Sequence, residues 1–203
     1  MIAYFLLGAT LAFAAAVQPG PLLVYLASRA VTDGWRRTLP AALAPLLSDG
    51  PIIVLVLTLL SRVPDRLLVA LRGGGGLFLL YLSFGAFKAW RNYRATIGRD
   101  PGAPRRSLFG ATVVNLLNPG PYLGWSLVLG PLLLKGWRET PANGVALLVG
   151  FYATMVIGLA GIILLFAKAR ILGPRVGRVL AGASVLALAC FGCYQLWMVA
   201  RNL

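Results

Sequence analysis

Asp49 is the acid whose position in the chain is best suited to chemistry. It lies near the middle of the otherwise uncharged stretch 38–61, and no other acid is so far inside an apolar segment. An ionised carboxylate at the centre of a membrane costs at least ~3 kcal/mol unless it faces a partner or water. We therefore expect Asp49 to bind a proton and a cationic group. In the alternative interpretation it bonds Ser48, or a backbone N–H freed by Pro45 or Pro51, and only holds a kink.

Two similar tetrapeptides offer the complementary chemistry. They are Gln18-Pro19-Gly20-Pro21 and Asn118-Pro119-Gly120-Pro121. Proline has no N–H, so each copy breaks a helix and frees backbone groups that must face protein, water or a ligand. Broken helices at corresponding places in two halves indicate the binding site of a secondary transporter. Where each helix restarts, its N–H groups and positive dipole end can hold a carboxylate, and Asp49 can take the ammonium group.

Amide side chains stand beside these breaks. Asn115 and Asn118 are three residues apart, which places them on one face if the helix continues, and Gln18 flanks the first break. These amides either line a cavity or form interhelical hydrogen bonds that hold the bundle together. We also expect Trp125 to line the site, because it closely follows the second break.

The composition is typical of a polytopic membrane protein. Of 203 residues, 59% are hydrophobic, 12% are charged and none is histidine. Six stretches are long enough to cross the hydrocarbon region as helices. They are 1–28, 38–61, 67–87, 107–134, 142–167 and 179–200. The sequence thus predicts an all-α membrane protein with six transmembrane helices and no separate soluble domain.

The basic residues predict topology and not nucleic-acid binding. The net charge is +14, and 13 of the 19 Lys and Arg residues fall in the loops 29–37, 88–106 and 168–178. This bias places those loops in the cytoplasm and both termini outside. No Lys or Arg precedes Arg29, so the first stretch lacks the basic region of a signal peptide and is expected to be the first helix.

The chain reads as an internal duplication. Gly34-Trp35-Arg36 follows the first tetrapeptide, and Gly136-Trp137-Arg138 follows the second. We expect two three-helix repeats, 1–90 and 107–203, joined by a basic cytoplasmic linker, 91–106. An odd number of crossings per repeat makes the repeats inverted, which suits alternating access.

In this order and spacing the motifs resemble the LysE/RhtB family of bacterial amino-acid exporters. Besides the tetrapeptides and Asp49, the resemblance includes Tyr81-Leu82-Ser83-Phe84-Gly85-Ala86-Phe87-Lys88 and Asn115-Leu116-Leu117-Asn118-Pro119. It implies an inner-membrane exporter, not an enzyme, which uses an ion gradient, commonly of protons, to move amino acids or related metabolites without a cofactor. Pro45 and Pro51 depart from the family pattern and predict a kinked or unwound second helix.

Other functions compete with this one. Cys190-x-x-Cys193 could relay electrons between thiols, although inert packing is the alternative for both side chains. An exporter of another small cation and a non-transporting scaffold also fit the composition. The run Gly73–Gly76 lacks the Lys-Ser/Thr of a phosphate loop and predicts close helix packing, and small residues would allow a homodimer. With few acids and no histidine, we expect no metal site.

Overall fold

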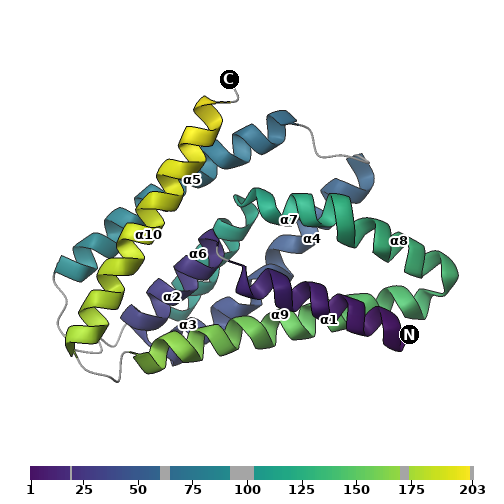
Figure 1. The fold of residues 1–203 in the computed structure, drawn as a ribbon, viewed down its shortest axis with the longest axis horizontal. Helices are drawn as coiled ribbons and strands as arrows, with labels where there is room; N and C mark the ends of the chain where they lie inside the picture. The colour runs from purple at the N-terminus through teal and green to yellow at the C-terminus, as the bar shows by residue number, and fades with distance from the viewer. Residues whose placement is uncertain (19, 60–64, 92–102, 170–173, 202–203) are drawn as a thin grey trace.

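The computed structural model describes residues 1–18, 20–59, 65–91, 103–169 and 174–201, and every element in these ranges is a helix (Figure 1). The elements in order are α1 (Ile2–Val17), α2 (Pro21–Asp33), α3 (Trp35–Thr38), the 3₁₀ helix η1 (Leu39–Leu43), α4 (Ala44–Leu59), α5 (Asp65–Arg91), α6 (Ala103–Leu116), α7 (Pro119–Gly124), the π-helix η2 (Trp125–Leu129), α8 (Gly130–Glu139), α9 (Pro141–Ala169) and α10 (Pro174–Ala200). The all-α prediction is confirmed for this part of the chain.

Both predicted helix breaks are present. α1 ends at Val17, and α2 begins at Pro21 with its axis bent by 65°. α6 ends at Leu116, and α7 begins at Pro119. Proline at the start of a helix costs nothing, because the first N–H groups have no partner within the helix. Pro21 and Pro119 therefore each start a new helix.

The second predicted span departs from regular geometry earlier than expected. Its irregular stretch is η1, which starts at Leu39 and ends at Leu43, before Pro45. The α-helix then continues through Asp49, with Pro51 inside α4. We predicted a kinked or unwound second helix, and the irregular stretch is instead a more tightly wound 3₁₀ segment about one turn upstream of Pro45, with Asp49 on the regular helix α4.

The hydropathy of the helices supports fewer crossings than the sequence predicts. Among the described residues, the segments Trp35–Val56, Pro141–Lys168 and Ala181–Ala200 are long and apolar enough to span a membrane. The bent pair α1 and α2 makes a fourth if it counts as one span. The stretches 67–87 and 107–134 are helical, in α5 and in α6 to α8, but they do not meet this test. Six crossings therefore remain a proposal.

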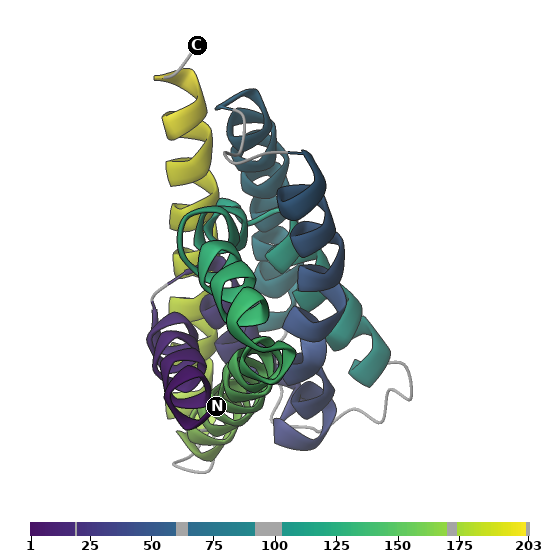
Figure 2. The same cartoon turned by 90° about the vertical axis from the view of Figure 1, so that its right-hand side faces the viewer.

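Glycine residues allow two long helix pairs to pack closely, α1 on α9 and α5 on α10 (Figures 1 and 2). A Cβ at Gly76 would lie 2.9 Å from the Gly192 carbonyl oxygen, and a Cβ at Gly192 would lie 3.0 Å from the Gly76 carbonyl oxygen. Gly8 and Gly150 similarly face backbone across the α1–α9 contact. A Cβ at Gly75 would lie 2.7 Å from the Leu117 carbonyl oxygen, at the second break. Close packing by the Gly73–Gly76 run is confirmed for Gly75 and Gly76.

We predict that Gly76→Ala destabilises the protein by about 1–3 kcal/mol, because the new methyl group overlaps the backbone of α10. Gly85→Ala is the matched control, since α5 is open at Gly85 and alanine is the better helix former. The measurement is thermal unfolding in detergent, followed by tryptophan fluorescence. Equal melting temperatures for the two variants would contradict the packing role of Gly76.

Candidate functional site

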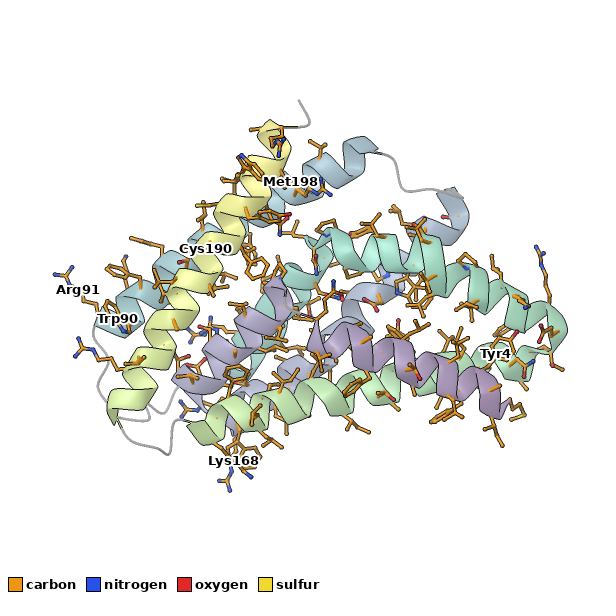
Figure 3. All side chains as sticks on the ribbon, in the orientation of Figure 1. Tyr4, Trp90, Arg91, Lys168, Cys190 and Met198 are labelled. Carbon is orange, nitrogen blue, oxygen red and sulfur yellow. The ribbon has the colours of Figure 1, made fainter. Side chains whose placement is uncertain are left out.

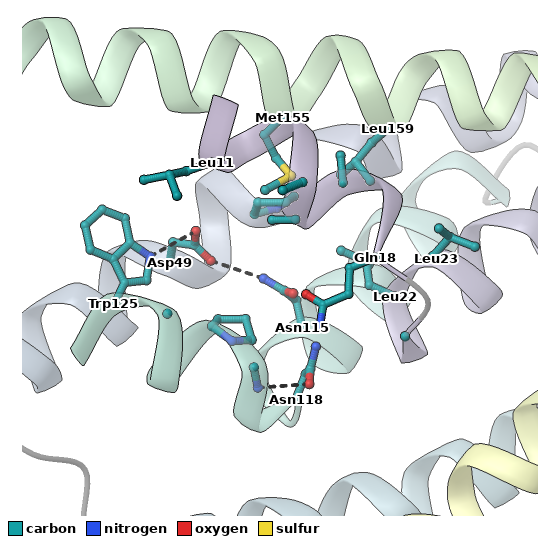
Figure 4. A pocket seen from close by; sticks show the side chains of 18 of the residues that line it. Leu11, Gln18, Leu22, Leu23, Asp49, Asn115, Asn118, Trp125, Met155 and Leu159 are labelled. Atoms are coloured by element: carbon teal, nitrogen blue, oxygen red, sulfur yellow. Dashed lines mark hydrogen bonds between the residues drawn. The ribbon is translucent and has the colours of Figure 1, made fainter. Parts of the chain in front are cut away.

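A cavity of about 520 Å³ lies where the two helix breaks meet (Figure 4). Its lining includes eight of the ten residues that the sequence predicts for the site: Gln18, Gly20, Pro21, Asp49, Asn115, Asn118, Gly120 and Pro121. Pro119 is not among the lining residues, and Pro19 lies outside the described residues. Segments about 100 residues apart in the chain thus contribute to one site.

Asp49 is 3% exposed and has four polar partners. Asn115 Nδ2 donates to its Oδ1 atom at 3.1 Å, and the Ser48 hydroxyl lies 3.4 Å from the same oxygen. Trp125 Nε1 and the Tyr152 hydroxyl donate to Oδ2 at 3.4 and 3.3 Å. Buried polar groups of this kind are tolerated because each has a partner. The contact with Ser48 agrees with the structural interpretation of the acid, but the other three partners come from distant helices.

Two of these distant partners, Asn115 and Trp125, lie where regular α-helix ends. Asn115 lies in the last turn of α6, and its Nδ2 atom also donates to Ser48 Oγ at 2.7 Å. Trp125 opens the π-helical segment η2, and such segments are frequent at functional sites. The indole is 1% exposed and stands edge-on to the Phe151 ring, with centroids 6.0 Å apart. Trp125 also lines the cavity, as the sequence predicts for a residue close behind the second break.

Tyr152 was not predicted from the sequence. Among the described residues, its hydroxyl is the one on α9 that contacts Asp49. A tyrosine in the middle of a strongly apolar span is the signal that could have found it. Tyr122 was missed in the same way. Its hydroxyl donates to the Leu116 carbonyl oxygen at 2.9 Å and so satisfies one backbone group at the second break.

The two breaks differ in how their new helices are capped. The Asn118 side chain accepts a hydrogen bond from Gly120 N at 3.1 Å and caps α7. α2 has Gly20 at its N-cap and no side-chain cap, and the two residues after Pro21, Leu22 and Leu23, both line the cavity. The positive end of the 13-residue helix α2 is therefore the better place for an anion.

Asn115 and Asn118 lie one turn apart at the end of α6. α6 ends at Leu116, but Leu117 N still donates to the Val113 carbonyl oxygen at 2.9 Å and Asn118 N to the Asn115 carbonyl oxygen at 3.2 Å. Both amides line the cavity. Asn115 donates to Asp49, whereas Asn118 accepts from Gly120 N and so caps α7.

Away from the cavity, α2 is fastened to α6. Tyr25 is 2% exposed, and its hydroxyl donates to the Ser107 carbonyl oxygen at 3.4 Å. A Cβ at Gly110 would overlap this hydroxyl, so the close approach depends on glycine. Arg29 Nε donates to the Tyr25 hydroxyl at 3.3 Å, and Arg29 Nη1 pairs with Asp33 Oδ2 at 3.2 Å. Arg29 therefore braces this contact and is not a cavity residue.

The two cysteines lie outside the cavity. Cys190 and Cys193 are exposed on α10, as Figure 3 shows for Cys190, and neither lines the pocket. Among the described residues, no three His, Cys, Asp or Glu side chains are grouped so that they could hold a metal ion.

Comparison with known proteins gives one family. A family model described as LysE type translocator matches residues 13–198. No curated protein and no solved structure matches the chain.

We predict that Asn115→Leu destabilises the protein by about 1–3 kcal/mol, because both Ser48 and Asp49 lose a buried donor. Asn143→Leu is the control: its side chain bonds Glu139 at an exposed position, so we expect a change within about 0.5 kcal/mol. Thermal unfolding of the purified variants in detergent makes the comparison. A smaller loss in Asn115→Leu than in the control would show that the network around Asp49 does not support the fold.

Proposed function

Because the chain belongs to the LysE type translocator family, we propose that it is a proton-coupled secondary exporter of amino acids or related small metabolites in the bacterial inner membrane. The observation that carries this proposal is the buried Asp49 carboxyl group, which faces a cavity between two broken helices. An acid within a membrane-spanning segment marks a substrate or proton pathway by default. Discontinuous helices at the same place supply the groups that bind the substrate.

The two ends of an amino acid match two features of the cavity. The α-carboxylate binds at the uncapped start of α2, where Leu22 and Leu23 present first-turn N–H groups. The ammonium group binds at Asp49. The amides of Gln18 and Asn115 line the space between these two sites. Gln18 can accept from an N–H or donate to a carboxylate oxygen, whereas the N–H groups of Asn115 donate to Ser48 and Asp49 and leave its carbonyl oxygen to accept from the ammonium group. The charges at the two ends of the cavity and these amides together orient the substrate.

Proton coupling follows from having a single acid in the site. Among the lining residues, Asp49 is the only one with a titratable side chain. A substrate ammonium and a proton therefore compete for the same carboxyl group. Binding of a proton from outside releases the ammonium there, and loss of that proton to the cytoplasm restores the site. One acid that serves both ligands in turn is sufficient to couple their opposite movements.

Alternating access requires two repeats that move against each other. The reciprocal contact of Gly76 on α5 and Gly192 on α10 supports this arrangement. A Cβ at either glycine would meet the carbonyl oxygen of the other, and α5 and α10 are the third helices of the two proposed repeats. We assign the ends of the helices near Arg91 and Lys168, at the same end of the molecule in Figure 3, to the cytoplasm. On this assignment the Tyr25 contact with α6 closes the cavity toward the cytoplasm.

We expect Asp49→Asn to abolish proton-driven amino-acid efflux while the protein still accumulates in the membrane, since asparagine keeps the shape of the side chain but binds no proton. Glu139→Gln is the matched control, because Glu139 is an exposed acid at the end of α8 and we expect full activity. The measurement is efflux of labelled amino acids from loaded cells, with and without a protonophore. Undiminished efflux in Asp49→Asn would overturn the assignment.

We expect Tyr25→Phe to open the cavity toward the cytoplasm. Loss of one hydrogen bond, worth about 1 kcal/mol, shifts the balance of states roughly fivefold. A cysteine introduced at cavity residue Leu22, in a background without Cys190 and Cys193, should then react faster with a maleimide added to the cytoplasmic face of inverted vesicles. Tyr194→Phe, at an exposed position on α10, is the control. Slower labelling in Tyr25→Phe would place the closure elsewhere.

A further inference from the structure

We infer that the cavity selects amino acids with uncharged, apolar side chains, such as leucine, valine and methionine. The inference rests on the proposed exporter function and goes beyond it by naming the substrate class. It follows from how the polar and apolar groups divide the cavity.

The polar groups of the cavity are sufficient for one amino group and one carboxylate. Asp49 provides the single acidic side chain of the lining, and no basic side chain lines it. The nearest cation described along α2, Arg29, is engaged by Asp33 and the Tyr25 hydroxyl. Once the backbone charges of the substrate are matched, neither a second ammonium nor a second carboxylate has a partner. A charged side chain would then be buried unpaired, which is strongly unfavourable.

The remainder of the wall is apolar, and its part on α9 is buried. Met155 and Leu159 project from α9 into the cavity, where Figure 4 shows them facing the polar groups. They are 7% and 2% exposed. Leu11, Leu129 and Phe151 extend this apolar surface. Such a surface gains from removing an aliphatic side chain from water and offers nothing to a hydroxyl, amide or charge.

The size and adaptability of this wall suit branched and unbranched side chains alike. The cavity of about 520 Å³ lies in the range of ordinary small-molecule sites. Methionine is flexible and polarizable, so Met155 can adjust its shape to different aliphatic groups. We therefore expect one apolar class and not a single substrate.

The test is export from cells loaded with equal amounts of labelled leucine, valine, methionine, threonine, lysine and glutamate. For the wild type we expect the apolar amino acids to leave at least ~10-fold faster than lysine or glutamate. Met155→Glu places a second acid on the apolar wall, and we expect it to lower leucine export and raise lysine export. Ile157→Leu is the control on the same helix, because Ile157 is 71% exposed and does not line the cavity, and we expect the wild-type preference to be retained.

The possible outcomes distinguish the apolar substrate class from the exporter function on which it rests. Export of lysine or glutamate in preference to leucine, lost in Asp49→Asn, would overturn the apolar class while the exporter function stands. Export of none of the amino acids above the level of empty cells would overturn the exporter function and the inference together. The wild-type panel decides these cases even if Met155→Glu does not accumulate.

Discussion

The absence of an N–H group in proline is the constraint on which the site depends. Pro21 and Pro121 each leave the carbonyl group four residues earlier without its helical donor. Both breaks must therefore find partners outside the helix ladder. At the second break, Tyr122 and Asn118 supply them from the chain itself. At the first break no side chain caps α2, and we propose that its first turn binds the substrate carboxylate.

Asp49 completes this arrangement by drawing three other segments to the breaks. Its partners come from α6, η2 and α9, so that one carboxyl group connects α4 to both sides of the second break. Hydrogen bonds in such a buried network reinforce one another, and the loss of one partner is costly. The same bonds hold the acid at the cavity wall in a defined orientation. Structural and functional interpretations of Asp49 therefore describe one network and do not exclude each other.

The features that could be predicted from the sequence are those set by local chemistry. Proline pairs stop helices whatever their surroundings, so both breaks were foreseen, and polar residues such as Asp49 and Asn115 stand out within apolar spans. The features that could not be predicted depend on packing between distant segments. The hydroxyl of Tyr152 reaches Asp49 only because α9 packs against α4, and the sequence does not show that contact. The π-helix η2 has no sequence signature either, because it arises where α7 and α8 join.

The most direct test of the account is a crystal structure of the protein, with ordinary methionine in the chain, soaked with selenomethionine as an apolar amino-acid substrate. Anomalous scattering from selenium locates the side chain independently of the remaining density. We predict a selenium peak beside Met155 and Leu159, with the amino group at Asp49 and the carboxylate at the start of α2. A selenium peak outside the cavity, or an amino acid bound without contact to Asp49, would contradict the account.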